Sequence, residues 1–349
     1  MTIQGRGATG NPPGRFEKLR YEPDEELPPD ERPSPRTVFL VDATRSALVR
    51  NDSPDVGFDV SVNPYRGCEH GCIYCYARPT HEYLGFSAGL DFETKILVKP
   101  DLPALLREEL MSTRFVPETI AISGVTDPYQ PVERTLRLTR GCLEVLAEFR
   151  NPVSVISKNE LIARDADVLG QLARVDAAQA IVSITTLDPA LARILEPRTS
   201  TPERRLAAIE ALAAAGVPVS VNVAPVIPAL NDHEIPAILA AAAKAGATAA
   251  AYLVLRLPGA VAPLFEAWLS EHFPDRKAKI LNRLRNMHGG KLNDPRFGKR
   301  MRGEGPFADE IRQLFTLAAR RAGLNRRQWK LSTAAFRRPV RPGAQLTLW

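Results

Sequence analysis

Three cysteines lie close together in the chain and could bind a metal centre. Cys68, Cys72 and Cys75 form a C-x3-C-x2-C pattern in the loop NPYRGCEHGCIYCYARP, and they are three of the four cysteines present. Such clustering in a chain without a secretory signal indicates metal binding rather than disulfides. Thiolates are the preferred ligands of iron–sulfur clusters, which normally take four protein ligands. Three ligands leave one iron open for a substrate or cofactor, as in a catalytic metal site.

Polar side chains, together with one glycine, also stand at or just after the ends of the predicted strands. These residues are Ser123, Gly124, Thr126, Asp127, Lys158, Ser183, Thr185 and Asn222. As a set, an ammonium, a carboxylate and hydroxyls suit a zwitterionic ligand that carries a ribose. The alternative is ordinary turn chemistry, because Asp before Pro and Ser or Thr at strand ends commonly cap loops.

These residues require elements that bring them together, and the chain alternates apolar strands with helical patterns. Near-continuous apolar runs are typical of strands buried on both faces. We therefore expect an α/β fold with a parallel sheet and right-handed crossovers. Six units are two short of a closed barrel, so we predict a partial (β/α)6 TIM-like barrel with its chemistry at the C-terminal strand ends. The predicted strands are residues 58–62, 119–123, 153–157, 180–186, 217–223 and 249–255, and the predicted helices are 100–112, 133–149, 161–172, 202–214, 236–245 and 263–272.

The cysteine loop resembles the radical S-adenosylmethionine (SAM) superfamily, whose motif is C-x3-C-x-aromatic-C with Tyr74 here as the aromatic residue. The likeness extends over about residues 58–272 and implies a barrel of the radical SAM type. It also implies a [4Fe–4S] cluster held by the three cysteines, whose open iron chelates SAM. One electron, from a donor such as flavodoxin or ferredoxin, then yields a 5′-deoxyadenosyl radical that abstracts hydrogen from a substrate.

The strand ends are similar to the spore photoproduct lyase branch of that superfamily and to its uncharacterised bacterial members. The resemblance implies SAM contacts from Thr126 with Asp127, Lys158 and Ser183. It also implies that Tyr74 and Tyr76 pass the radical back to SAM, with aromatic packing as the alternative. Gly124 stands where the lyase has a hydrogen-donating cysteine, so the lyase's own reaction does not carry over.

Charge divides the chain into regions. Residues 276–349 hold 19 Lys and Arg but 4 Asp and Glu, whereas the chain as a whole has a net charge of +6. We expect a disordered tail at 1–36, which contains seven of the 30 prolines, a core domain at 37–275 and a basic helical extension at 276–349 packed on the barrel. The basic extension favours a nucleic-acid substrate for repair or modification, or else it is a solvated surface. No apolar run suits a membrane helix, and we expect a cytoplasmic protein.

Other functions stay open at this stage. The same radical chemistry can act on a protein or peptide, and a zinc-stabilised nucleic-acid-binding module would use His70 or His81 as a fourth ligand. The final residues Gln345, Leu346, Leu348 and Trp349 resemble the pentapeptide that docks bacterial replication and repair proteins on the DNA sliding clamp. The alternative for that segment is packing of Trp349 against its own barrel.

Overall fold

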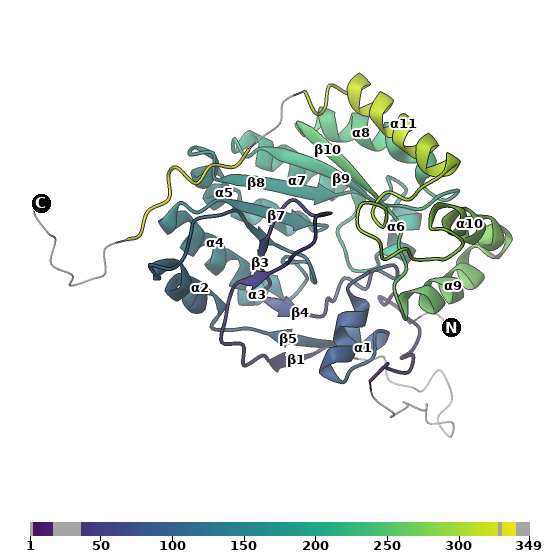
Figure 1. The fold of residues 1–349 in the computed structure, drawn as a ribbon, viewed down its shortest axis with the longest axis horizontal. Helices are drawn as coiled ribbons and strands as arrows, with labels where there is room; N and C mark the ends of the chain where they lie inside the picture. The colour runs from purple at the N-terminus through teal and green to yellow at the C-terminus, as the bar shows by residue number, and fades with distance from the viewer. Residues whose placement is uncertain (1–2, 17–35, 327–329, 340–349) are drawn as a thin grey trace, which may run out of the picture.

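A seven-stranded sheet forms the centre of the computed structural model, which describes residues 3–16, 36–326 and 330–339 (Figure 1). The strand order is β10-β9-β8-β7-β6-β3-β2, and every pair is parallel except β2 with β3. The six predicted strands are therefore confirmed as one parallel sheet. Their bounds are β3 Val60–Val62, β6 Ile120–Ile122, β7 Val153–Ser157, β8 Ala178–Ser183, β9 Val219–Val226 and β10 Ala249–Val254, with β2 at Val49–Arg50.

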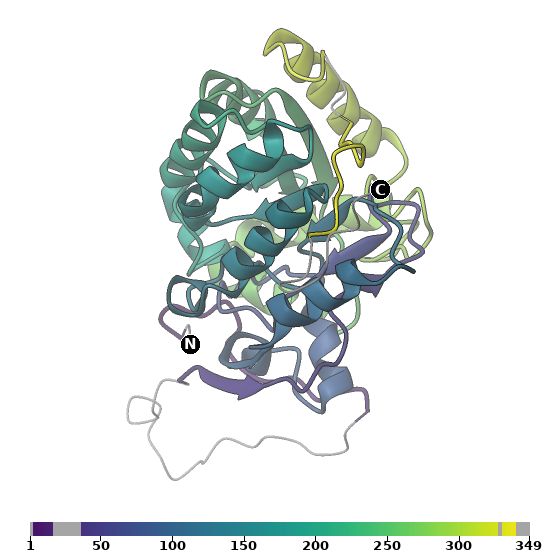
Figure 2. The ribbon, with the colours of Figure 1, turned by 90° about the vertical axis from the view of Figure 1, so that its left-hand side faces the viewer.

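Helices cover the outer face of this sheet and shield its apolar strands, and Figure 2 shows them as a layer around the curved sheet. The main core lies between the two layers, where the side chains of β6, β7 and β8 meet the apolar faces of α2, α4 and α5. This arrangement is the predicted partial α/β barrel. The covering helices are α2 Leu102–Met111, α4 Leu138–Phe149, α5 Ala166–Ala173, α6 Pro189–Leu195, α7 Pro202–Ala214 and α8 Ile235–Lys244, the last preceded by the 3-10 turn η3 Asp232–Glu234.

Two predicted helices differ from the structure. The helix expected at 133–149 is divided into α3 Glu133–Leu136 and α4, because Arg137 between them has the left-handed φ of 52° and interrupts the hydrogen-bonding pattern. The helix expected at 161–172 begins as a 3-10 segment, η2 Glu160–Asp165, and continues as α5. The spacing of apolar residues locates such helices but does not reveal these breaks.

A small second sheet lies beside the barrel, with the order β1-β5-β4. Its strands are β1 Val38–Val41, β5 Lys95–Val98 and β4 Tyr65–Arg66, and the strand predicted near residue 38 is its edge. Between β4 and β5 the chain forms the cysteine loop, the 3-10 segment η1 Arg78–Leu84 and the short helix α1 Leu90–Thr94. The second sheet thus holds both ends of the segment that contains the cysteines.

Residues 3–16 are docked on the protein, which corrects the prediction of a disordered tail for that part of 1–36. The backbone N–H groups of Gly7 and Ala8 donate to the carboxylate of Glu93 at 3.0 and 2.8 Å. Ala8 is completely buried in an apolar cluster with Cys72, Ile73 and Tyr74. The composition of the segment predicted disorder. It did not reveal the contacts with Glu93, which lies 86 and 85 positions away from Gly7 and Ala8 in the sequence. Residues 17–35 lie outside the described part.

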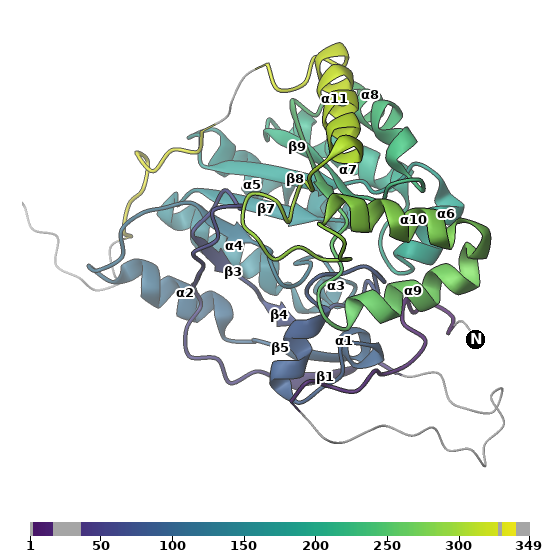
Figure 3. The same cartoon turned by 45° about the vertical axis from the view of Figure 1, so that its right-hand side comes forward.

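The C-terminal region continues from the barrel as α9 Val261–His272, α10 Pro274–Met287, a loop over 288–305 and α11 Pro306–Arg321 (Figure 3). Helix α11 packs against α8, and the loop reaches the free edge of β10, where the Val254 N–H donates to the Met301 carbonyl at 2.9 Å. The side chain of Asn325 hydrogen-bonds to the same edge, where it accepts from the N–H of Ala250 and donates to its carbonyl. The clamp-like segment that includes Gln345 and Trp349 lies outside the described residues. Within the described ranges, no helix has the length and apolar character needed to cross a bilayer.

Candidate active site

The three cysteines of the loop line one cavity of about 260 Å³ at the carboxyl ends of the parallel strands. Cys68 and Cys72 are buried, Cys75 is partly buried, and all three thiols are free. Burial raises the pKa of the Cys72 thiol well above its usual range, and burial together with the nearby Cys68 raises that of Cys75 to about 11. Without a bound cation the Cys72 and Cys75 thiols stay protonated at neutral pH, so they suit a metal centre that stabilises thiolates.

The structure brings the predicted site residues together, with one exception. Thr185 is completely buried beside the cavity and does not line it. Its hydroxyl donates to Glu196 at 2.6 Å, and it accepts from Lys158 at 3.0 Å, so it lies behind that lysine. The predicted residues that do line the cavity with the cysteines are Tyr74, Tyr76, Ser123, Gly124, Thr126, Asp127, Lys158, Ser183 and Asn222.

Asp127 organises the cavity wall from within the chain. Its carboxylate accepts hydrogen bonds from the backbone N–H of Lys158 at 2.7 Å and from the Ser157 hydroxyl at 2.8 Å. One of its oxygens also lies 3.4 Å from Nδ1 of the buried His70. Burial lowers the pKa of His70, but Asp127 and then Cys68 outweigh that effect and raise it to about 10. Asp127 therefore acts as a turn-capping residue, as the alternative allowed, and also joins two loops of the site.

Lys158 is held by a buried polar network that sequence reasoning did not identify. Its Nζ lies 3.1 Å from Glu196 and donates to the Ala224 carbonyl at 2.7 Å. Glu196 is buried and also pairs with Arg205 and with the Tyr74 hydroxyl. Burial, followed by the charge of Arg205, lowers the pKa of Lys158 to about 7. The sequence signal for this network is the Glu-Pro-Arg-Thr run that follows α6.

Asn222 offers an unused polar atom to a ligand in the cavity. Its Oδ1 is buried and has no hydrogen-bond partner among the described residues. A buried amide oxygen without a partner costs free energy, so this atom is suited to a bound donor. Together with the three thiols, it makes the cavity fit both a metal centre and a polar organic cofactor.

The two histidines considered as a fourth zinc ligand both have other contacts. Over the described ranges, no group of three or more His, Cys, Asp or Glu side chains is placed to hold one metal ion. His81 does not line the cavity; it packs against Phe86 and Phe92, and its Nε2 lies 2.9 Å from the Lys95 carbonyl. His70 does line the cavity, where it is already engaged by Asp127.

Behind the cysteine loop, a buried ion pair fixes the backbone. The guanidinium of Arg78 donates to the carbonyl of Cys72 and to Glu93 at 2.6 Å, and neither charged side chain is exposed. The Glu93 carboxylate also accepts hydrogen bonds from the backbone N–H groups of Gly7 and Ala8. Gly7 lies so close that a Cβ added there would be 1.8 Å from the Gly71 carbonyl oxygen. The N-terminal segment, Glu93 and Arg78 therefore form one support beneath the cysteines.

The cavity reaches solvent where its lining carries an exposed aromatic ring. Tyr76 is 45% exposed, and its hydroxyl donates to the Gly124 carbonyl at 2.5 Å. The guanidinium of Arg256 lies 4.5 Å from the centre of this ring. Arg256 and Met301 also line the cavity. The entrance thus combines a ring, a cation and the loop 288–305.

Comparisons with known proteins agree with this geometry. Residues 62–242 match the family model of the Radical SAM superfamily. An uncharacterized protein of Mycobacterium tuberculosis is 40% identical over 233 residues, which cover 66% of this chain and 67% of the relative. An uncharacterized protein of Methanocaldococcus jannaschii is 28% identical over 173 residues, covering 50% and 62%.

Solved structures of spore photoproduct lyase share the fold. A mutant of that enzyme superimposes with a TM-score of 0.59 at 17% sequence identity, covering 82% of this chain and 80% of the other. A second mutant, with bound AdoMet and dinucleoside spore photoproduct, gives the same TM-score, identity and coverage. The likeness extends to most of the described barrel.

Proposed function

Because the chain belongs to the radical SAM superfamily, we propose that this enzyme acts on a nucleic acid, which it repairs or modifies. The family uses a [4Fe–4S] cluster and SAM. When bound, these two groups supply a 5′-deoxyadenosyl radical that takes a hydrogen atom from the substrate. The protein's part is to hold the cofactors, orient the substrate and exclude water.

The residues of the cavity divide between these tasks. Cys68, Cys72 and Cys75 would hold the cluster, and the support from Arg78 fixes the backbone that carries them. Lys158 and the free oxygen of Asn222 would bind polar groups of SAM, together with Thr126, Ser123 and Ser183. The buried Tyr74 hydroxyl donates to Glu196, and this contact suits a role of Tyr74 in packing. Tyr76 stands at the entrance and is the better candidate for contact with the substrate or for radical transfer.

The entrance is the observation that carries the nucleic-acid proposal. An exposed tyrosine ring backed by an arginine is a surface on which a nucleobase can stack. Here Tyr76 and Arg256 form such a surface in the lining of the cysteine cavity. The structural neighbour with bound dinucleoside spore photoproduct supports the same class of substrate.

Charge on the loop 288–305 is smaller than its sequence indicates, because part of it is neutralised within the chain. Lys299 pairs with Glu304 at 2.5 Å, and Arg300 pairs with the buried Asp55 at 2.5 Å. Arg302 has no carboxylate partner in the described part of the chain. We infer that binding rests on a few unpaired cations and on stacking, which gives a moderate dependence of affinity on salt.

The test is anaerobic turnover of the reconstituted protein with SAM and a reductant. We expect 5′-deoxyadenosine to form, and its rate to rise when DNA or RNA is added. Cys72→Ala should abolish both the cluster absorption near 400 nm and the product, whereas Cys142→Ala should retain them because Cys142 is buried in α4, away from the cavity. Stimulation by a peptide but by no nucleic acid would refute the proposed substrate.

Two further points follow from the proposal. The one-electron reduction requires a donor such as flavodoxin or ferredoxin. A cluster and free thiols are retained in a reducing compartment, which supports a cytoplasmic location.

A further inference from the structure

Glu196 is a buried carboxylate on which two cations and two hydroxyl groups converge. It follows α6 directly, and its side chain is completely buried. Its Oε1 accepts hydrogen bonds from the hydroxyls of Tyr74 and Thr185 and lies 3.1 Å from Nζ of Lys158. Its Oε2 pairs with the guanidinium of Arg205 on α7. Glu196 does not line the cysteine cavity, so any effect it has there passes through Lys158 and Tyr74, which do line it.

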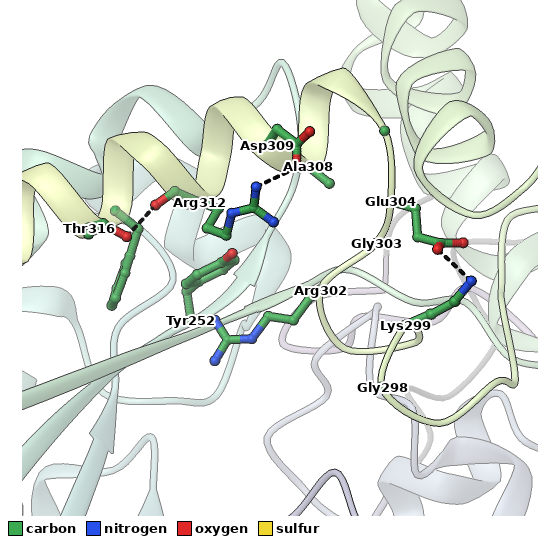
Figure 4. Close-up of a pocket in the computed structure, with 12 residues that line it drawn as sticks. Tyr252, Gly298, Lys299, Arg302, Gly303, Glu304, Ala308, Asp309, Arg312 and Thr316 are labelled. Atoms are coloured by element: carbon green, nitrogen blue, oxygen red, sulfur yellow. Dashed lines mark hydrogen bonds and ion pairs between the residues drawn. The ribbon is translucent and has the colours of Figure 1, made fainter.

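The two cations share this one carboxylate. Neither Lys158 nor Arg205 pairs with a second carboxylate in the described part of the chain. The arrangement differs in the cavity of about 710 Å³ beside α11, where Figure 4 shows Arg312 paired with a carboxylate of its own, Asp309. The group of Glu196, Lys158 and Arg205 therefore has one positive charge in excess. A buried cation without its own counter-charge is costly, so this excess favours a negatively charged group in the cysteine cavity.

Lys158 is held in one position by three acceptors. Its ammonium donates to the Ala224 carbonyl at 2.7 Å and to the Thr185 hydroxyl at 3.0 Å, and Glu196 is the third acceptor. An ammonium has three N–H groups, so these three contacts fix its position. The acceptors come from β9, from the segment after β8 and from the segment after α6. Because a carbonyl and a hydroxyl are neutral, Glu196 supplies the only negative charge among them.

The same carboxylate connects the lysine with the cysteine loop. Tyr74 lies between the second and third cysteines of the loop, and its hydroxyl meets the Lys158 ammonium on Oε1 of Glu196. Arg205 holds the carboxylate by the other oxygen, and its guanidinium also donates to the Ser183 carbonyl at the end of β8 at 3.0 Å. Glu196 thus keeps the lysine and the cysteine loop at a set distance from each other.

We propose that Glu196 is a positioning residue for SAM, because it holds the ammonium of Lys158 as a fixed positive charge at the wall of the cysteine cavity. SAM has a carboxylate in its amino-acid part, and this group supplies the negative charge that the three buried side chains lack. The inference rests on the SAM contact proposed for Lys158 and is independent of the class of substrate. Without the charge of Glu196, Lys158 and Arg205 would repel each other, and the ammonium would leave its present position.

The experiment measures the affinity of the reconstituted protein for SAM by anaerobic equilibrium dialysis, with the cluster oxidised so that no turnover is needed. Glu196→Gln removes the charge and keeps the size, Lys158→Met removes the ammonium, and a double variant combines the two changes. Thr185→Val is a milder change that removes one neutral contact of the ammonium. Asp165→Asn is the matched control. Asp165 is also completely buried and also bonds a tyrosine hydroxyl and two arginines, and none of these residues lines the cavity.

We expect Glu196→Gln to weaken SAM binding about tenfold and Thr185→Val severalfold, with iron content unchanged and Asp165→Asn within about twofold of the parent. Since Glu196 acts through Lys158, the double variant should bind SAM no more weakly than Lys158→Met alone. In the formation of 5′-deoxyadenosine, Glu196→Gln should raise the KM for SAM about tenfold and leave kcat within about twofold. A general structural defect would instead lower kcat together with the iron content.

The variants separate the failure of this inference from the failure of the SAM contact on which it rests. Unchanged or tighter SAM binding by Glu196→Gln, with weaker binding by Lys158→Met, would refute the role of Glu196 and retain the contact of Lys158. Losses that add in the double variant would also refute that role. Unchanged binding by Lys158→Met would refute the SAM contact itself. If Glu196→Gln does not fold, Thr185→Val decides, and an affinity equal to that of Asp165→Asn refutes the inference.

Discussion

Two loops border the cysteine cavity, and they are held by different kinds of interaction. The cysteine loop rests on the unexposed pair of Arg78 and Glu93, whose carboxylate also receives the N-terminal segment. The loop 288–305 is held largely by ion pairs with exposed partners, such as Lys299 with Glu304. Its less exposed anchors include the pair of Arg300 with Asp55 and the contact of the buried His288, whose Nε2 lies 2.9 Å from the Leu255 carbonyl.

This difference matches the role that we propose for each loop. Ligands of a metal centre must keep a fixed geometry, and a buried, fully bonded network provides it because breaking any part leaves an unpaired charge. A surface that receives a large polar substrate has to exchange its own ion pairs for contacts with that substrate. Exposed pairs contribute little free energy and are easily exchanged. The following predictions test this contrast, starting with the largest effect.

Removing the charge of Glu93 should have the largest effect. Glu93→Gln leaves the buried Arg78 guanidinium without a counter-charge, so we expect the free energy of unfolding to fall by about 3–5 kcal/mol. Glu148→Gln, the same change in an exposed pair with Arg107, should cost less than about 1 kcal/mol. Anaerobic urea unfolding followed by circular dichroism measures both values. Similar losses in the two variants would remove the distinction between buried and exposed support.

Lowering the pH should reduce the stability of the folded protein through protonation of His81. Burial lowers the pKa of His81 to about 4, below the value of about 6.5 in an unfolded chain. Between these values the unfolded chain binds the proton and the folded chain does not. The free energy of unfolding should therefore fall as the pH falls from 6.5 to 4, by up to about 3 kcal/mol, and this contribution should be constant above pH 6.5.

The variant His81→Gln isolates that contribution to the pH dependence. Its unfolding free energy should depend less on pH between 6.5 and 4 than that of the parent, whatever its stability at neutral pH. His233→Gln, at an exposed position, should keep the dependence of the parent. The prediction fails if the two variants give the same slope.

A methyl group at Gly7 tests the N-terminal segment. The Cβ of Gly7→Ala would lie 1.8 Å from the Gly71 carbonyl oxygen, so the segment must shift away from the cysteine loop, at a cost of about 1–3 kcal/mol. Gly10→Ala is the matched control, because its Cβ would meet nothing within 4 Å. We expect faster loss of iron to a chelator from the first variant alone. Equal rates would show that the segment does not support the cluster.

The smallest effect should come from the opposite loop. Lys299→Gln breaks an exposed pair with Glu304 and should change the free energy of unfolding by less than about 1 kcal/mol. Its iron content should equal that of the parent. A loss of iron comparable with that of Gly7→Ala would contradict the contrast between the two loops.

Sequence patterns predicted those parts of the molecule that depend on local or repeated signals. The six barrel strands are apolar because both faces are buried, and the spacing of the cysteines follows from the chemistry of a three-ligand cluster. The polar residues at the strand ends lie on one cavity because parallel strands end at the same edge of the sheet. Thr185 is the exception, since its position near a strand end does not reveal that Lys158 stands in front of it.

Other features depend on contacts between distant segments and left no such signal. Nothing in the sequence pairs Glu93 with Gly7, so the proline-rich residues 1–36 resembled a disordered tail throughout. Glu196 and Arg205 meet only through the fold, and the short strands β4 and β5 carry too few residues for a pattern. Charge counting also overestimated the basic loop, because the acidic partner Asp55 of Arg300 comes from a segment about 245 positions earlier.

The open barrel leaves β10 as a free edge of the large sheet, a place where two molecules could join through backbone hydrogen bonds and aggregate. Asn325 occupies the N–H and the carbonyl of Ala250 at one end of that edge, and the loop occupies the N–H of Val254 near the other. A single side chain and a single loop residue thus act as a cover against intermolecular strand addition. The same loop that borders the cysteine cavity therefore also shields this edge of the sheet from pairing with a second molecule.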